Sequence, residues 1–229
     1  MDYREFKLTK IEDVIEGVRI FSFLGEVPQY KPGNFFLIRL SGADGKKIFR
    51  PFSAATHPSE HNLRFCVKRN GAFTSLLWNL REGDCAEIAG PYGTFLLDGN
   101  DTERVFIAGG TGITPLRSMI LQTLIEEKRA SLFHSASTLS GIICADEMKL
   151  YEAKNPDFRF FPAVTREGMP QGWEGMRGRL TADAIAQRLG TLSGKTFYIC
   201  GPKEMVETLA GGLIGAGVQK EKIRKEEWG

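Results

Sequence analysis

The chain has 229 residues, 42% of them hydrophobic, and a formal net charge of +2 at pH 7. That length can bury one large core or two modest ones, and the nearly balanced charge favours neither nucleic acid nor a membrane surface as a partner. Residues 1–7 are charged and lack the apolar region of a secretory signal, and no apolar run could cross a bilayer, so we expect a cytoplasmic protein.

The first hundred residues show short strand patterns separated by turn signals. Strands are predicted at 18–24, 35–40, 63–67 and 86–89, and a short helix is predicted at 72–80. The sequence Gly90-Pro91-Tyr92-Gly93 predicts a turn after the last of these strands. Many short strands at this spacing favour a small antiparallel barrel, which we place at residues 1–100.

Near residue 100 the pattern changes, and strands begin to alternate with helices. Strands are predicted at 104–108, 132–134, 158–164 and 196–200. Helices are predicted at 115–129, 146–153 and 202–210. Such alternation implies a parallel sheet covered by helices on both faces, so residues 101–229 are expected to form an α/β domain.

The cysteines and histidines do not follow a metal-ligand pattern. The cysteines are far apart in the sequence, at Cys66, Cys85, Cys144 and Cys200. Without a Cys-x-x-Cys pair they predict neither zinc nor an iron–sulfur cluster, and a cytosolic location argues against disulfides. His57 and His61 flank a polar stretch that contains Pro58, which predicts a turn rather than a metal site. His134 lies in an apolar segment and is expected to be packed.

A glycine-rich turn follows the first strand of the second half. Its sequence is Gly109-Gly110-Thr111-Gly112-Ile113-Thr114-Pro115. Thr114 is predicted to cap the following helix, with Pro115 at its first position. The glycines would let the backbone approach a ligand, and the free amides of the helix start would attract a phosphate. A plain strand-to-helix turn remains the alternative, because the pattern is neither Gly-x-Gly-x-x-Gly nor a Walker loop.

A second turn, Cys200-Gly201-Pro202, follows a later strand of the same half. Ligands of open α/β sheets bind outside the carboxyl ends of the strands, so Cys200 is expected to face a pocket. The alternative is a buried small hydrophobic residue, which is the commoner fate of a free cysteine.

Five motifs in this order resemble the ferredoxin–NADP⁺ reductase superfamily, from about Lys10 to the last residue. They are Arg50-Pro51-Phe52-Ser53, Gly71-Ala72-Phe73-Thr74, the loop 109–115, Cys200-Gly201-Pro202 and Glu226-Glu227-Trp228. The resemblance implies an N-terminal antiparallel Greek-key β-barrel that binds FAD, at residues 1–100. A Rossmann-like parallel α/β domain for NAD(P) would follow at residues 101–229, with a C-terminal aromatic tail that returns to the flavin.

The resemblance assigns the flavin to the first two motifs. Arg50 would pair with the pyrophosphate, Phe52 would lie against the isoalloxazine, and Ser53 would place its hydroxyl near the flavin N5 atom. Pro51 belongs to the same FAD-binding motif. Phe52 replaces the family's usual tyrosine, so a phenol hydrogen bond is lost while ring packing remains. The alternative for Phe52 is a place in the barrel core.

Further flavin contacts would come from the next strand and from the chain's end. The backbone of Val67 and Lys68 would meet the ribityl and phosphate groups, and Gly71 to Thr74 would form a phosphate turn. Trp228 would cover the flavin ring, and Glu226 would carry a proton. A solvated face for Lys68 and a frayed tail for Trp228, which Gly229 follows, are the alternatives.

The same resemblance assigns the nicotinamide nucleotide to the second half. Its loop would comprise Gly110, Thr111, Gly112, Ile113, Thr114 and Pro115. Cys200, with Gly201 and Pro202, would lie beside the reacting nicotinamide carbon.

The choice of nucleotide depends on basic residues for a 2′-phosphate. Thr165-Arg166-Glu167 and Arg179 resemble the basic elements of NADPH-using reductases. Ser137 stands where an arginine is often found, and Trp173-Glu174-Gly175 is similar to NADH-using oxygenase reductases. The balance favours NADPH over NADH.

The activity implied is hydride transfer from NADPH or NADH to FAD, followed by single-electron transfer to a separate carrier. Ser53, Cys200 and Glu226 would be the catalytic residues. Ferredoxin, flavodoxin or an oxygenase component would be the carrier. The basic residues at 220–225 would dock an acidic carrier or form a solvated surface. The alternatives are a flavin subunit of a larger complex, of dihydroorotate dehydrogenase or hydrogenase type, a catalytically silent flavin-binding redox module, and a free-flavin reductase.

Overall fold

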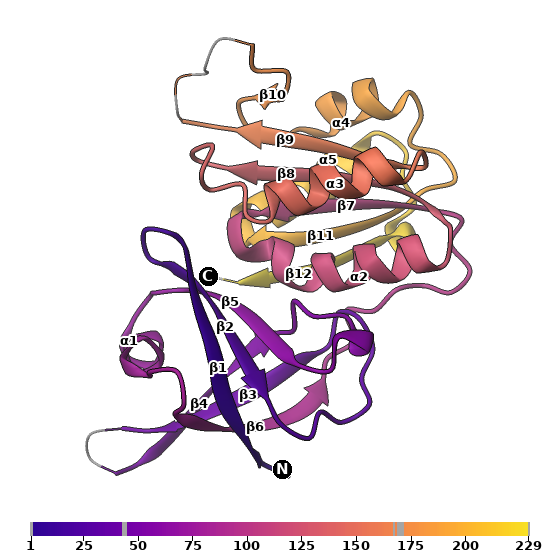
Figure 1. Cartoon of the computed structure of the whole chain (residues 1–229). Helices are drawn as coiled ribbons and strands as arrows, with labels where there is room; N and C mark the ends of the chain where they lie inside the picture. Colours follow the sequence, from indigo (N-terminus) through magenta and orange to yellow (C-terminus); the bar gives the residue numbers. More distant parts are fainter. Residues whose placement is uncertain (1, 43–44, 167, 169–171, 229) are drawn as a thin grey trace. The chain divides into compact units, whose positions relative to one another are not determined.

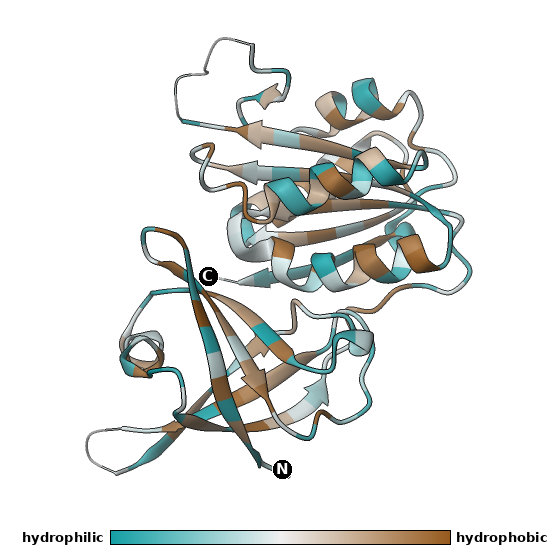
Figure 2. Ribbon diagram, viewed as in Figure 1, coloured by the Kyte–Doolittle hydropathy of each residue, from teal (hydrophilic) through white to brown (hydrophobic). Residues whose placement is uncertain are grey.

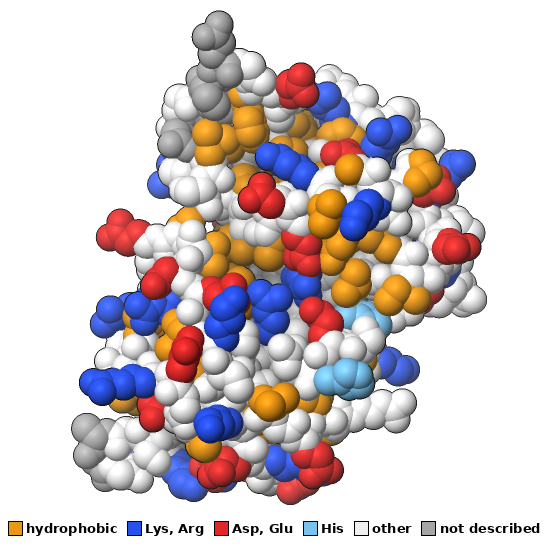
Figure 3. Space-filling model, in the orientation of Figure 1, with side chains coloured by type: hydrophobic (Ala, Val, Ile, Leu, Met, Phe, Trp, Pro, Cys, Tyr) orange, Lys and Arg blue, Asp and Glu red, His pale blue; other side chains and the backbone are white. Residues whose placement is uncertain are grey.

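The computed structural model describes residues 2–42, 45–166, 168 and 172–228 (Figure 1). The chain divides into two compact units. The N-terminal unit is residues 1–97 with Arg117–Met119, and the C-terminal unit is residues 98–116 with 120–229. Among the described residues, no helix combines the length and apolar character that a membrane span requires. On the face shown in Figure 3, acidic and basic side chains are interspersed, in keeping with the small net charge.

The N-terminal unit is a six-stranded antiparallel sheet that curls on itself. Its strands are β1 (Arg4–Ile15), β2 (Val18–Leu24), β3 (Phe35–Ser41), β4 (Lys47–Ser53), β5 (Leu63–Lys68) and β6 (Cys85–Tyr92), in the order β4-β3-β6-β1-β2-β5. The two edges meet just beyond β4, where the Ala55 amide donates to the Arg64 carbonyl of β5 at 2.8 Å. The predicted antiparallel barrel is therefore confirmed.

Aromatic side chains fill this barrel. Phe21, Phe23, Phe36 and Phe65 are fully buried in one cluster, and burying such a side chain contributes about 1.5–3 kcal/mol. Between β5 and β6 lies α1 (Ala72–Asn79), which confirms the predicted helix and adds Leu77 to the cluster.

The turn predicted at residues 90–93 is wrong, because β6 continues to Tyr92. The register of β6 against β3 shifts between the pairs Leu37↔Ala89 and Phe35↔Tyr92. Gly90 and Pro91 are therefore absorbed in an irregularity of the strand, where the ring of Phe36 packs against Gly90 and leaves no room for a side chain.

The C-terminal unit is a six-stranded parallel sheet with helices on both faces (Figure 1). Its strands are β7 (Glu103–Gly109), β8 (Arg129–Ala136), β9 (Phe158–Val164), β10 (Met176–Arg177), β11 (Thr196–Pro202) and β12 (Ile223–Trp228), in the order β10-β9-β8-β7-β11-β12. Its helices are α2 (Ile113–Ile125), α3 (Ala145–Lys154), α4 (Ala182–Leu189) and α5 (Lys203–Gly215). The central strands are hydrophobic, whereas the helices alternate in polarity (Figure 2). The predicted α/β arrangement is confirmed.

The ends predicted for the first helix of this unit are wrong. The helix α2 begins at Ile113, with Gly112 as its N-cap, because a 3₁₀ turn over Gly110–Gly112 leads directly into it. Thr114 is consequently inside the helix, where its hydroxyl donates to the Thr111 carbonyl at 2.6 Å. The helix ends at Ile125, because Glu127 adopts a left-handed φ of 53° that reverses the chain before β8.

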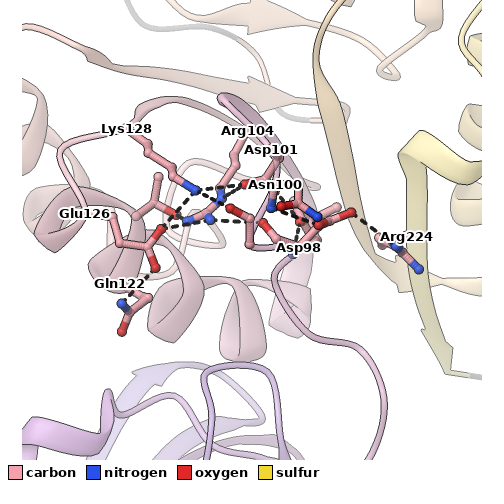
Figure 4. Close-up of polar contacts among 11 residues, drawn as sticks. Asp98, Asn100, Asp101, Arg104, Gln122, Glu126, Lys128 and Arg224 are labelled. Carbon is pink, nitrogen blue, oxygen red and sulfur yellow. Dashed lines mark hydrogen bonds and ion pairs between the residues drawn. The ribbon is translucent and has the colours of Figure 1, made fainter.

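A buried cluster of charges, which we call the Arg104 cluster, binds the segment 98–101 at the start of this unit to the strands of its sheet (Figure 4). Arg104 of β7 is fully buried. Its guanidinium donates to the Asp101 carboxylate at 2.7 Å and to the Thr123 hydroxyl at 2.9 Å, and it pairs with the Glu126 carboxylate at 2.8 Å. Such a cluster is stable only while each charge keeps its partner.

Tyr198 of β11 completes the Arg104 cluster. Its hydroxyl donates to the second oxygen of Asp101 at 2.6 Å and accepts from the Asp98 amide at 2.8 Å. Burial, and then the bond to Asp101, raises the pKa of Tyr198. Arg224 of β12 pairs with the Asp98 carboxylate at 3.4 Å, so the segment 98–101 is bound to strands from three parts of the sequence.

Candidate functional site

The two motifs assigned to a flavin come together in the N-terminal unit. Arg50 to Ser53 form the end of β4, and Gly71 to Thr74 begin α1. The rings of Phe52 and Phe73 stack with their centroids 5.8 Å apart and their planes at 29°, which joins the two motifs. Segments about twenty residues apart in the sequence are thereby held on one part of the barrel.

The start of α1 is suited to bind an anion. Gly71 is its N-cap with a φ of 95°, and no described side chain caps the helix there. The first amides of a helix have no intrahelical acceptor and present partial positive charge. The Thr74 hydroxyl donates to the Gly71 carbonyl at 3.1 Å and accepts from the Asn70 amide at 2.7 Å, so it holds the turn in shape.

Basic side chains belong to the segments that carry the two motifs. Arg50, Lys68 and Arg69 are exposed, and Arg69 Nε lies 3.4 Å from the Ser75 hydroxyl of α1. One donor of Arg50 is used within the strand, in a 2.7 Å bond to the Phe49 carbonyl. An exposed guanidinium is well suited to phosphate oxygens. Val67 is buried in the core, so a contact from this residue to a ligand would come from its backbone.

The remaining residues of the first motif differ in exposure. Pro51 is exposed, whereas Phe52 and Ser53 are half-buried. Phe52 packs against the barrel core, with its ring 6.5 Å from that of Phe65. Its ring therefore takes part in core packing, which was the alternative considered for it.

The two motifs assigned to a nicotinamide nucleotide come together at the edge of the C-terminal sheet formed by the carboxyl ends of its parallel strands. Strands β7, β11 and β12 are adjacent and parallel, so their carboxyl ends lie side by side. These ends carry the Gly109–Gly112 turn, Cys200-Gly201-Pro202 and Trp228 respectively. Ligands of parallel α/β sheets bind at this edge.

The glycines of the loop are required at their positions for different physical reasons. A Cβ on Gly112 would overlap the Cys200 carbonyl and lie 2.8 Å from the outermost carbon of the Trp228 indole. A Cβ on Gly109 would lie 2.7 Å from the Met205 sulfur. Gly110, in contrast, has a φ of 52°, and apart from its two chain neighbours no described residue has an atom within 4 Å of the place of its missing Cβ. Crowding requires the first two, and backbone conformation requires Gly110.

His134 also contacts this loop, which the sequence did not reveal. It is fully buried near the end of β8, in accord with the packed position expected for it. Its Nε2 lies 3.0 Å from the Gly110 carbonyl oxygen. Burial lowers the pKa of His134 to about 4, so the ring is neutral at pH 7 and Nε2 carries the proton that the carbonyl accepts.

Cys200, Glu226 and Trp228 are grouped on β11 and β12. Cys200 is buried, and it pairs with half-buried Glu226 in the register of the two strands. Burial, and then the Glu226 carboxylate, raises the pKa of the Cys200 thiol, which is therefore protonated at neutral pH. Trp228 is 39% exposed and ends a paired strand rather than a frayed tail. Gly229 lies outside the described residues.

Residues assigned to the nucleotide's 2′-phosphate are found beyond β9 and β10. The Thr165 amide donates to the Ala136 carbonyl at 3.0 Å, which places this segment beside the end of β8. Arg166 is exposed there, and Arg179 is exposed but paired with Glu204 at 3.4 Å. Arg177 is a further exposed arginine, not identified from the sequence, that lies opposite Val164 in the β9–β10 register. Glu167 lies outside the described residues.

The histidine pair has a structural role in the N-terminal unit. The His57 ring accepts from the Ser59 amide and caps a 3₁₀ turn at Pro58–Glu60, which confirms the predicted turn. Within the part of the chain that the structure describes, no group of three or more potential ligands is arranged to hold a metal ion. The four cysteines, all of them described, form no disulfide with one another.

Comparison with known proteins identifies both units. Residues 5–96 match the family model of the oxidoreductase FAD-binding domain, and residues 106–210 match that of the oxidoreductase NAD-binding domain. The reductase component of phenol 2-monooxygenase from Pseudomonas sp. strain CF600 is 29% identical over 99% of this chain and 65% of its own length. A component of the Na⁺-translocating NADH-quinone reductase from Methylococcus capsulatus is 30% identical over 91% of this chain and 56% of its own length.

The chain thus spans between half and two thirds of the length of these relatives. A solved structure of similar fold is the ferredoxin NADP⁺ reductase from Neisseria gonorrhoeae with bound FAD and NADP, with a TM-score of 0.88, 22% identity and 99% coverage of both chains. An FAD-binding and an NAD-binding oxidoreductase domain follow one another in the order that the motifs predicted. The chain belongs to the ferredoxin–NADP⁺ reductase superfamily of FAD- and NAD-binding oxidoreductases.

Proposed function

We propose that the chain is a flavin-dependent oxidoreductase that takes a hydride from NADPH or NADH and passes electrons one at a time to a separate protein carrier. When bound, FAD supplies the chemistry that links a two-electron donor to a one-electron acceptor. The observation that carries the proposal is the meeting of the Gly109–Gly112 turn, Cys200 and Trp228 at one edge of the sheet.

The N-terminal unit would hold the FAD. Arg50 and the amides at the start of α1 would bind its pyrophosphate, with Lys68 nearby and the Val67 backbone along the ribityl chain. Pro51 and the accessible edge of Phe52 would lie against the flavin ring, and Ser53 would offer a hydroxyl to its N5 atom. Gly71 and Thr74 would act by shaping the phosphate turn.

The C-terminal unit would hold the nicotinamide nucleotide. The loop from Gly110 to Pro115 would bind the pyrophosphate, and Cys200, Gly201 and Pro202 would line the place of the nicotinamide. Because its thiol is protonated, Cys200 would act as a neutral packing group and not as a nucleophile. Glu226, opposite Cys200, would hold or deliver a proton. The Trp228 ring, which now packs on Gly112, would give way to the nicotinamide.

We propose NADPH as the preferred nucleotide. Thr165, Arg166 and Arg179 support this choice, and exposed Arg177 adds a further positive charge next to the end of β9. Guanidinium groups bind phosphate oxygens in bidentate fashion, and a 2′-phosphate is the feature by which NADPH differs from NADH.

The proposed partner is ferredoxin, flavodoxin or an oxygenase component. A relative that is the reductase component of a monooxygenase supports the last of these. Of the basic residues near the C-terminus, Arg224 pairs with Asp98 and Lys225 with Glu227. An acidic carrier would therefore meet mainly Lys220 and Lys222, and electron transfer to it should slow as salt rises.

The test is an anaerobic titration of the FAD-loaded protein with NADPH and, in parallel, with NADH. We expect either nucleotide to bleach the visible absorbance of the flavin, with NADPH effective at the lower concentration. A protein that keeps FAD but is bleached by neither nucleotide would be a silent redox module. Loss of the flavin on gel filtration would instead indicate a free-flavin reductase, and a chain that never retains FAD would refute the proposal.

A further inference from the structure

The buried imidazole of His134 is unusual for its surroundings. Its strand neighbours are Ala108 of β7 and Pro162 of β9, and the ring is fully buried. Nδ1 has no hydrogen-bond partner among the described residues. A buried polar atom without a partner destabilises the fold, so an apolar side chain would suit the core better. The gain that offsets this cost is found at Nε2, which donates to the Gly110 carbonyl at 3.0 Å.

The peptide between Gly110 and Thr111 is the part of the loop whose orientation is least restricted by its own residues. Gly110 has a φ of 52°, and open space lies where other residues carry a side chain. A glycine in this setting can adopt several backbone conformations at little cost. The Ile113 amide also donates to the Gly110 carbonyl, but it belongs to the same short turn. His134 supplies a bond from the rigid sheet.

Holding the Gly110 carbonyl also determines where the next amide points. In a planar trans peptide the carbonyl and the following N–H point in opposite directions. The Gly110 oxygen points to His134 in the sheet, so the Thr111 N–H points away from the ring. Thr111 lies in the 3₁₀ turn Gly110–Gly112 that leads into α2, and the first amides of a helical turn have no acceptor within it and favour a phosphate.

We infer that His134 is a positioning residue that orients the Gly110–Thr111 peptide so that the Thr111 amide can donate to the pyrophosphate of the nicotinamide nucleotide. This inference rests on the proposed function. His134 lies outside all recognised motifs, and its role would be to hold the loop in the conformation that binds the nucleotide. His134 would touch neither nucleotide nor flavin, and its effect would be on nucleotide binding and not on the reaction.

The test compares three variants of the FAD-loaded protein. His134→Phe keeps a flat ring but removes the donor, and His134→Gln keeps a donor. Thr196→Val is the matched control, because Thr196 is also fully buried in the same sheet, its hydroxyl has no partner among the described residues, and it belongs to no proposed site. The dissociation constants of NADP⁺ and NAD⁺ are measured by calorimetry, and KM and kcat are measured for NADPH.

We expect His134→Phe to weaken NADP⁺ binding about tenfold, which equals about 1.4 kcal/mol, and to raise KM with kcat unchanged. His134→Gln should recover most of the affinity, and Thr196→Val should bind as the wild type does. Equal affinity of His134→Phe and wild type, or an equal loss in Thr196→Val, would overturn the inference. A wild-type protein that binds neither nucleotide would refute the proposed function itself.

A second measurement does not depend on whether a variant folds. The ¹⁵N chemical shifts of the His134 ring in the wild-type protein report which nitrogen carries the proton. We expect the Nε2–H form at neutral pH, in agreement with the bond to the Gly110 carbonyl. The Nδ1–H form would leave no donor for this carbonyl and would overturn the inference.

Discussion

Replacing Arg104 by methionine should destabilise the C-terminal unit much more than the loss of one surface charge would. The side chains of Arg104 and Asp101 are both fully buried. Without the guanidinium, the described partners of the Asp101 carboxylate are the Tyr198 hydroxyl at 2.6 Å and Lys128 Nζ at 3.5 Å. Removing one partner of a buried ion pair costs about 3–5 kcal/mol, because the other charge stays in a medium of low polarity.

Hydrogen exchange followed by mass spectrometry can measure this loss in each unit separately. Amides of β7 and β11 should lose protection by roughly two to four orders of magnitude, since each 1.4 kcal/mol is about a factor of ten. Amides of β1 and β2 should exchange as in the wild type, because these strands belong to the N-terminal unit.

Arg129→Met is the matched control. Arg129 pairs with Asp157 at 3.3 Å, but the two side chains are 73% and 57% exposed, and such surface pairs contribute about 0–1 kcal/mol. Adding Asp101→Asn to Arg104→Met should restore part of the loss, because it removes the unpaired charge. A loss of protection in Arg104→Met that is below tenfold, or no larger than in Arg129→Met, would refute the reasoning.

Three other results are expected. Arg50→Ala should weaken FAD binding by about 1.5–3 kcal/mol, as expected for a charge-assisted hydrogen bond, and a fluorescence titration that finds unchanged affinity would make Arg50 ordinary surface. Gly112→Ala should abolish flavin reduction by NADPH in stopped-flow experiments, because its Cβ would overlap the Cys200 carbonyl; normal rates would contradict the close packing. Burial lowers the pKa of His134 from 6.5 to about 4, so between these pH values the unfolded chain binds more protons than the folded chain, and stability decreases as the pH is lowered. Relative to His134→Gln, urea unfolding of the wild type should lose about 2 kcal/mol between pH 7.5 and pH 5, and parallel pH profiles would exclude this effect.

Strands with a clear hydrophobic pattern could be predicted from the sequence. The bounds of β2 and β9 agree with the prediction residue for residue. The strand β4 was not predicted, because Lys47 to Ser53 are mostly exposed and include Pro51, so there is no alternation to detect. β12 was missed for a similar reason, since Ile223 to Trp228 form a polar strand at the edge of the sheet.

The motifs of the candidate site could be found in the sequence, but the contacts that support them could not. Arg104 at the start of an otherwise apolar strand, three residues after Asp101, is the one local signal of the Arg104 cluster. The bond between His134 and Gly110 joins residues 24 positions apart. It depends on the order of strands in the sheet, and side-chain periodicity carries no information about that order.

The placement of Trp228 on β12 affects how its indole can move. The backbone of β12 is paired with β11 along its whole length, up to the pair Pro202↔Trp228. The indole can therefore leave the space over Gly112 by rotation about the side-chain torsions of Trp228. The backbone hydrogen bonds between β11 and β12 stay intact during this rotation. Rotamer changes of exposed side chains take picoseconds to nanoseconds, much faster than the detachment of a strand. Access to this edge of the sheet should accordingly be limited by the arrival of the ligand and not by opening of the chain.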